Sequence, residues 1–206
     1  MIRLLAGLVG WLAAGTAVAA TLLVFGDSLA AGYGLPQGTG WVHLLEQRIE
    51  KHGYDYKVIN ASISGETATG GRQRIGPALA THRPEIVILE LGANDGLRGQ
   101  PLNGIEQNLA AIIQICREQR VRVLLVGIQL PPNYGARYAQ GLQAIYPTLA
   151  KRYRLPLVPF LLEGFAQRRE FFQADGLHPT AEAQPLVLEN VWRPLARLLR
   201  PARRAP

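Results

Sequence analysis

Short uninterrupted runs of aliphatic residues alternate along the chain with longer stretches in which apolar residues recur every three or four positions. An unbroken aliphatic run is typical of a strand that is covered on both faces, whereas the three-to-four spacing is typical of an amphipathic helix. The runs predict five strands, at Thr21–Phe25, Tyr56–Asn60, Ile86–Leu91, Val121–Gly127 and roughly Leu155–Val158. The helical spacing predicts helices at Gly40–Lys51, about Gly71–His82, Pro101–Arg120, Ala136–Tyr153 and about Pro179–Leu199, with Pro179 at a helix start.

This alternation predicts an α/β fold in which helices cover both faces of a five-stranded parallel sheet. The sequence contains no internal repeat, linker or low-complexity block, so residues 20–206 are expected to form one domain. In doubly wound sheets the ligand crevice lies beyond the carboxyl ends of the strands. Residues that carry chemistry should therefore follow strands directly.

The first residues differ from the rest of the chain. Arg3 precedes an apolar run from Leu4 to about Ala14, and an A-x-A pattern ends at Ala19. This layout is typical of a secretory signal peptide, which predicts cleavage near Ala19 and a periplasmic or secreted protein. The alternative is an uncleaved membrane anchor, but the second half of the segment is Ala, Gly and Thr, which insert weakly. We therefore expect residues 1–19 to be removed, with no stable membrane insertion afterwards.

Charge adds little to this picture. The 206 residues carry a formal charge of +7, or +6 without Arg3, and 48% of them are hydrophobic, as in ordinary globular proteins. Much of the excess lies at the end of the chain, in Arg197, Arg200, Arg203 and Arg204. No nucleic-acid-binding motif accompanies it, so a solvated tail and no nucleic-acid partner are expected, with affinity for anionic membranes as an alternative.

The single cysteine, Cys116, cannot close a disulfide within the chain. It lies on the apolar side of the Pro101–Arg120 pattern, so we expect a buried hydrophobic side chain rather than a nucleophile.

Polar residues suited to acyl transfer follow the first three predicted strands and precede the last predicted helix. They are Gly26-Asp27-Ser28-Leu29, Asn60-Ala61-Ser62-Ile63-Ser64-Gly65, Gly92-Ala93-Asn94-Asp95 and Asp175-Gly176-Leu177-His178-Pro179. A serine hydroxyl needs a neighbouring base, and a carboxylate holds a histidine base in the correct tautomer. Asp175 and His178, three apart in a turn with Gly176, can meet, which makes Ser28, His178 and Asp175 a candidate triad.

The same chemistry needs N–H donors for the negative charge that develops on the substrate oxygen. The backbone amides of Ser28 and Gly65 and the side-chain amide of Asn94 are candidates for this oxyanion hole. Each residue alone has a plainer interpretation. Ser28 could cap a helix, Gly65 and Asn94 could be turn residues, and Asp175 with His178 could form a surface turn or bind a metal.

Other active-site patterns are absent from the sequence. Ser28 is not in a G-x-S-x-G elbow and has no Lys three residues later, which excludes two serine-hydrolase layouts. The dinucleotide fingerprint G-x-G-x-x-G does not follow the first strand, which argues against a nicotinamide enzyme.

The four blocks together resemble those of the SGNH, or GDSL, hydrolases, which are named for the Ser, Gly, Asn and His that the blocks contain. Further stretches are similar to the bacterial periplasmic thioesterase/protease/lysophospholipase (arylesterase) branch, namely GDSLAAGY at 26–33, NASISG at 60–65, ELGANDGLRG at 90–99 and NYGARY at 133–138. The resemblance implies a flavodoxin-like α/β/α fold and no metal or organic cofactor. It also implies Ser28 as nucleophile, His178 as base, Asp175 as its orienting acid, and Ser28, Gly65 and Asn94 as the oxyanion hole.

The resemblance further implies hydrolysis of acyl thioesters, aryl and short-chain esters, and lysophospholipids. Loops after the third and fourth strands should flank the crevice, and their apolar residues could line an acyl groove or simply pack as loops. The candidates for substrate binding are Leu97, Leu130, Pro131 and Tyr134. Two alternatives remain, a carbohydrate O-deacetylase of the same family and a non-catalytic envelope binding protein.

Overall fold

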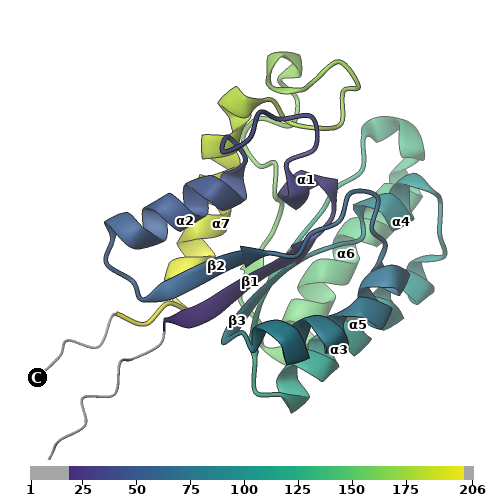
Figure 1. Ribbon diagram of the computed structural model, residues 1–206. Coiled ribbons are helices and arrows are strands. Elements are labelled where there is room, and N and C mark those ends of the chain that lie inside the picture. Colours follow the sequence, from purple (N-terminus) through teal and green to yellow (C-terminus); the bar gives the residue numbers. More distant parts are fainter. Residues whose placement is uncertain (1–18, 202–206) are drawn as a thin grey trace, which may run out of the picture.

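A computed structural model describes residues 19–201, and the expected signal segment, apart from Ala19, lies outside them. Five parallel strands form one sheet in the order β2-β1-β3-β4-β5 (Figure 1). Their bounds are β1 Ala20–Gly26, β2 Tyr56–Asn60, β3 Ile86–Glu90, β4 Arg122–Val126 and β5 Leu157–Val158. The prediction of a five-stranded parallel α/β fold is confirmed.

Helices cover both faces of this sheet (Figure 1). Helix α2 (Trp41–Lys51) packs beside α7 (Gln184–Ala196) on one face. The other face carries α3 (Ala68–His82), α5 (Leu102–Glu118) and α6 (Ala136–Tyr153). The central strand β3 is buried along its whole length, as expected for a strand between two helical layers.

The last helix begins later than the sequence predicted. Pro179 pairs with Phe172 in an isolated bridge, and α7 begins at Gln184 after a short 3₁₀ turn, Ala181–Ala183. Pro185, not Pro179, occupies the first turn of the helix, where the missing N–H costs nothing. The expectation of a helix start at Pro179 was therefore wrong.

Cys116 is fully buried on α5, and burial raises the pKa of its thiol to about 12. The thiol is therefore protonated at neutral pH, as the apolar pattern predicted. Within residues 19–201, no helix is long and apolar enough to cross a bilayer, and no group of three His, Cys, Asp or Glu side chains could hold a metal ion.

Candidate active site

Ser28 lies where the sheet's first strand ends. It begins the short helix α1 (Ser28–Ala31), and the preceding Asp27 caps that helix by accepting a hydrogen bond from the Leu29 amide at 3.0 Å. Asp27 therefore has the capping role that the plainer interpretation gave to Ser28, and the serine hydroxyl is free for another partner.

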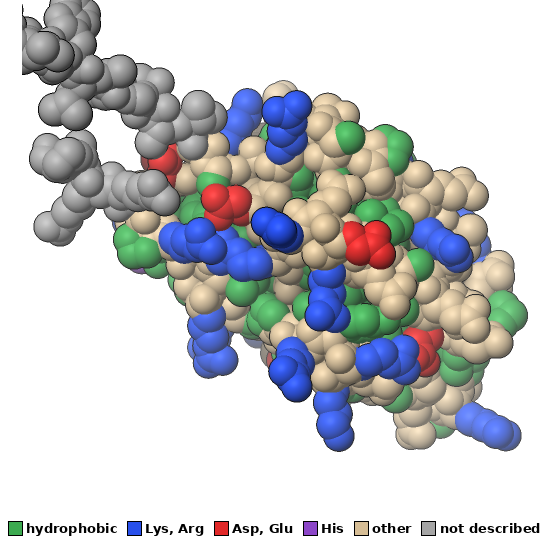
Figure 2. Space-filling model, turned by 90° about the horizontal axis from the view of Figure 1, so that it is seen from below, with side chains coloured by type: hydrophobic (Ala, Val, Ile, Leu, Met, Phe, Trp, Pro, Cys, Tyr) green, Lys and Arg blue, Asp and Glu red, His purple; other side chains and the backbone are tan. Residues whose placement is uncertain are grey.

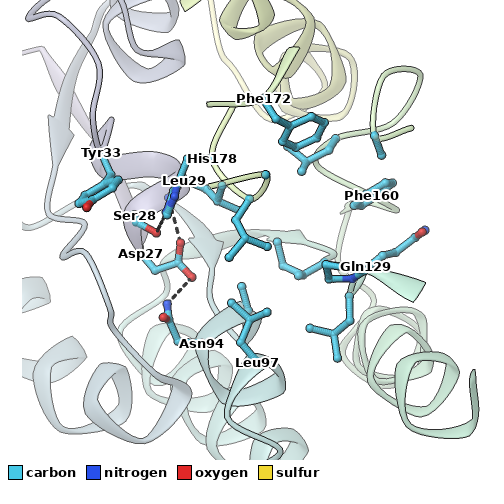
Figure 3. A pocket seen from close by; sticks show the side chains of 18 of the residues that line it. Asp27, Ser28, Leu29, Tyr33, Asn94, Leu97, Gln129, Phe160, Phe172 and His178 are labelled. Atoms are coloured by element: carbon cyan, nitrogen blue, oxygen red, sulfur yellow. Dashed lines mark hydrogen bonds between the residues drawn. The ribbon is translucent and has the colours of Figure 1, made fainter. Parts of the chain in front are cut away.

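That partner is His178, 150 residues further along the chain (Figure 3). Ser28 Oγ lies 2.8 Å from His178 Nε2, and His178 Nδ1 lies 2.7 Å from Asp175 Oδ2. Burial alone would raise the pKa of Asp175, but hydrogen bonds from the Leu177 amide and from the His178 ring and amide lower it to about 2. An ionised carboxylate can only accept, so Nδ1 carries the proton and Nε2 accepts from the serine hydroxyl.

Hydrogen bonds within the loop that holds Asp175 and His178 fix the conformation of that loop. The backbone amide of Gln173 donates to the His178 carbonyl at 2.8 Å, and the backbone amide of Thr180 donates to the Phe171 carbonyl at 2.8 Å. The Arg169 guanidinium donates to three successive carbonyls, those of Phe172, Gln173 and Ala174. The carboxylate and the imidazole are thus set relative to each other by contacts within residues 169–180.

The three expected N–H donors come from three separate segments that face one cavity: the starts of α1 and of α4 (Ala93–Leu97), and the loop between β2 and α3. Ser28, Gly65 and Asn94 all line it, and within residues 19–201 the Ser28 and Gly65 amides have no backbone hydrogen-bond partner. Gly65 has a φ of 82°, a backbone conformation that glycine adopts without strain. Asn94 donates through Nδ2 to Asp27 Oδ2 at 3.1 Å, which holds the amide beside Ser28 (Figure 3).

Beneath these donors lie two carboxyl groups that are both fully buried, Asp27 and Glu90. Glu90 Oε2 accepts a hydrogen bond from the Asp27 amide at 3.1 Å. Burial raises the pKa of Asp27 to about 6, although hydrogen bonds from Leu29 and Asn94 offset part of this effect. Burial and the neighbouring Asp27 raise the pKa of Glu90 well above its ordinary value. A Cβ on Gly26 would lie 2.5 Å from Glu90 Oε2, which explains the glycine before Asp27.

These raised pKa values predict a stability that falls as pH rises. The folded protein binds the Asp27 proton more tightly than the unfolded chain does, so the stabilisation is complete below about pH 4 and is lost as pH rises through about 6. From the shift between 3.8 and about 6, Asp27 contributes on the order of 3 kcal/mol. Glu90→Gln removes one of the two titrations and the repulsion that the other carboxylate experiences. Urea unfolding between pH 4 and 8 should therefore give a flatter profile for this variant.

The exposed substitution Glu182→Gln is the matched control, and its profile should follow that of the unmodified protein. The measurements stay above pH 4 because Asp175, whose pKa is lowered, destabilises the fold only as pH falls further. Parallel profiles for Glu90→Gln and Glu182→Gln would contradict the assignment of the pH effect to the buried carboxyl pair.

An arginine of α3 fastens the loop that carries Gly65. Arg74 Nη1 donates to the Ala61 carbonyl at 2.8 Å, and Arg74 Nε donates to Glu66 Oε2 at 2.8 Å. These two acceptors lie at the two ends of the loop. The guanidinium also packs over the Phe25 ring, 4.2 Å from its centre, so its orientation is fixed from a third side.

A cavity of about 510 Å³ opens beside Ser28 and is lined mainly by apolar side chains. Leu97, Leu130 and Pro131 line it, as the sequence suggested, whereas Tyr134 is not among the lining residues and lies in the 3₁₀ turn Pro132–Tyr134. Figure 3 shows Ser28, His178 and Asn94 grouped together, with the apolar side chains extending away from them.

Sequence reasoning missed several lining residues, notably Phe160 and Leu162, which follow β5, and Phe172. The strand-end rule could have found the first two, because they come directly after a strand. Tyr33 was also missed; its ring lies over the His178 ring with a centroid separation of 4.6 Å. Tyr33 ends the GDSLAAGY stretch at 26–33, which gave it no role of its own, and nothing in the local sequence pattern marked Arg74.

Comparisons with known proteins agree with this geometry. Residues 24–185 match the GDSL-like Lipase/Acylhydrolase family. The chain is 50% identical to Esterase TesA of Pseudomonas aeruginosa over 183 residues, 89% of this chain and 91% of that protein. It is 42% identical to Thioesterase 1/protease 1/lysophospholipase L1 of Escherichia coli strain K12 over 185 residues, 90% of this chain and 86% of that protein.

A solved structure of TesA superposes on the fold with a TM-score of 0.85 and 50% sequence identity, covering 87% of this chain and 99% of that one. The family match spans most of the chain, and these two relatives are 42–50% identical to it. The chain belongs to the GDSL-like lipase/acylhydrolase family, the SGNH hydrolases, and it is an enzyme.

Proposed function

We propose that the protein is an exported serine esterase that hydrolyses carboxylic esters and acyl thioesters with Ser28 as nucleophile. The observation that carries the proposal is the continuous chain of hydrogen bonds from Ser28 Oγ through His178 to Asp175, beside a cavity lined by N–H donors. Export rests on the sequence of residues 1–19 alone.

In the first step Ser28 Oγ attacks the acyl carbon while its proton passes to His178 Nε2. Asp175 stabilises the imidazolium that forms and does not itself take the proton. Negative charge builds on the former carbonyl oxygen, where the amides of Ser28 and Gly65 and the Asn94 side chain donate to it. The intermediate collapses, the alcohol or thiol takes the proton from His178, and the acyl group stays on Ser28.

In the second step a water molecule gives its proton to His178 Nε2 and attacks the acyl-enzyme. The same donors stabilise the second oxyanion, and Ser28 recovers its proton as the carboxylic acid leaves.

The lining of the cavity favours a fatty acyl group over an acetylated sugar. Exposed apolar side chains at its mouth, Tyr33 and Leu177, extend the apolar surface outwards. A sugar ring would need polar partners here, whereas Phe160, Leu162 and Phe172 offer none from their side chains. Single-chain lysophospholipids are substrates of the same chemical class, since they present one acyl ester to the site.

A substrate series tests this proposal. With p-nitrophenyl esters and acyl-CoAs of increasing chain length, kcat/KM should rise by about three- to fourfold per added CH₂ until the cavity is filled. The reaction should also show an initial burst of alcohol or thiol, since an acyl-enzyme forms before it is hydrolysed. Activity confined to acetylated sugars would instead identify a deacetylase, and no turnover of any ester would contradict the proposal.

Arg74 provides a further prediction, as a positioning residue for the Gly65 amide. Arg74→Met keeps an unbranched apolar side chain but removes the bonds to Ala61 and Glu66 and the guanidinium over Phe25. We expect kcat to fall by about tenfold with little change in KM, because a displaced donor matters most in the transition state. The matched control is Arg72→Met, on the same helix, whose guanidinium contacts Asn108 instead. Equal effects of the two variants, or a loss that appears only in KM, would contradict the role.

A further inference from the structure

Positive charge is concentrated at the end of the molecule opposite the cavity. This end, called the basic end, comprises residues 50–57, 82–85, 117–122, 153–157 and 193–201, where helices finish and strands begin. It carries ten Lys and Arg against four Asp and Glu, a net charge of +6. The other described residues carry nine against eleven, a net charge of −2. Seen from below, the molecule shows many Lys and Arg side chains and few Asp and Glu (Figure 2).

Three of these charges occupy positions that are costly for an arginine. Arg83, Arg120 and Arg154 have φ values of 44°, 61° and 55°, and they are the non-glycine residues with positive φ among residues 19–201. Each follows the end of a helix, where glycine is the usual residue because a side chain strains the left-handed conformation. The chain does place a glycine, Gly53, after α2. Arginine at the other three ends is thus a charge kept at a conformational cost.

No ion pair among the described residues offsets this conformational cost of the three arginines. All three are exposed, and within residues 19–201 none has an acidic side chain at ion-pair distance. A cation at a helix C-terminus gains some energy from the helix dipole, but the last turns of α5 and α6 already carry Arg117, Lys151 and Arg152, which supply that without strain. The charges at these three positions are therefore available to a binding partner outside the fold.

We propose that the basic end docks on the surface of an anionic phospholipid bilayer. Its charges come from five separate chain segments, and none of them lines either of the two cavities described among residues 19–201, so they suit an extended anionic surface better than a nucleic-acid strand held in a cleft. Two half-buried aromatic residues of the kind found at membrane–water interfaces, Tyr54 and Trp192, lie together at the same end. In this orientation the cavity, at the carboxyl ends of the strands, faces away from the bilayer and remains open to esters in solution.

Vesicle co-sedimentation of residues 20–206 tests the proposal, with phosphatidylcholine vesicles that contain or lack phosphatidylglycerol. Binding should require the anionic lipid and weaken with salt. The triple variant Arg83→Asn, Arg120→Asn, Arg154→Asn should lower the partition coefficient by about a hundredfold. Asparagine tolerates the left-handed conformation, so the variant should unfold at the same temperature as the unmodified protein or higher. Replacing the three residues by Lys should retain binding.

Two further measurements make the test specific. The control triple Arg72→Gln, Arg137→Gln, Arg168→Gln removes the same charge from the rest of the surface and should leave binding nearly unchanged. Vesicle-bound enzyme should hydrolyse a water-soluble ester at its free rate. The proposal is overturned if both triples lose binding equally, if binding does not need anionic lipid, if bound enzyme is inactive because the cavity meets the bilayer, or if duplex DNA binds more tightly through the same arginines.

Discussion

Replacing Ser28 by alanine should lower kcat by about five to six orders of magnitude while the fold and its thermal stability are unchanged. The hydroxyl contributes little to stability, since its partner is the His178 ring and Asp27 already caps α1. Without it no acyl-enzyme forms, and only the donors and the cavity remain to assist direct attack by water. The measurement is the steady-state hydrolysis of a p-nitrophenyl ester, accompanied by the initial burst.

Ser64→Ala is the matched control, because Ser64 lines the same cavity but does not contact His178. Labelling with an alkyl phosphonate should modify the unmodified protein and Ser64→Ala once each, at Ser28, and leave Ser28→Ala unlabelled. Turnover in Ser28→Ala close to that of the control would refute the nucleophile assignment and, with it, the proposed function.

Asn94→Ala should give the second largest loss, about 10²- to 10³-fold in kcat, with KM nearly unchanged. The amide is already aimed by Asp27, so it donates to the oxyanion without having to reorganise. A boronic acid that mimics the tetrahedral intermediate should lose affinity by a similar factor, because the missing donor contributes to both states. Kinetics and inhibitor titration on the same protein preparation check the two expectations together.

Asn94→Asp sharpens this prediction, since it keeps the shape but replaces the donor by an acceptor. It also sets a third carboxyl group against the buried Asp27, so its activity should be no higher than that of Asn94→Ala. Asn108→Ala, outside the cavity, is the control and should retain full activity. A loss in Asn94→Ala that appears only in KM would show that the amide binds substrate and not the transition state.

The sequence predicted the inner strands well because β1, β3 and β4 are buried on both faces and so appear as unbroken aliphatic runs. Strand β2 and helix α6 have the bounds that were expected, and Ser28, Gly65 and Asn94 do follow strands, whereas Asp175 and His178 lie well beyond β5. Prediction was poorest where long-range contacts decide local structure. The bridge between Phe172 and Pro179 keeps the segment before α7 extended, and no periodicity in the sequence indicates such a pairing.

The residues of the candidate site also differ in how well the sequence could predict them. Ser28, Gly65, Asn94, Asp175 and His178 could be proposed because each belongs to a short block of recognisable composition. Arg74 could not, because its importance lies in contacts with another loop. Tyr33 does belong to such a block, GDSLAAGY, but its contact with the His178 ring forms only in the folded chain. Glu90 did carry a signal, an acid closing a run of buried aliphatic residues, and a buried carboxyl group calls for an explanation.

The self-fastened loop of residues 169–180 has a consequence for motion. Since Arg169 and the Gln173 amide tie that segment internally, Asp175 and His178 would travel together if it swung outwards. Such a swing would separate the imidazole from the hydroxyl and from the Tyr33 ring and would break the bond from Gln173 Nε2 to the Tyr33 carbonyl, while the pairing of imidazole with carboxylate survived. The acid–base pair therefore depends on contacts inside one segment, whereas its distance from the nucleophile depends on how that segment packs against the rest of the fold.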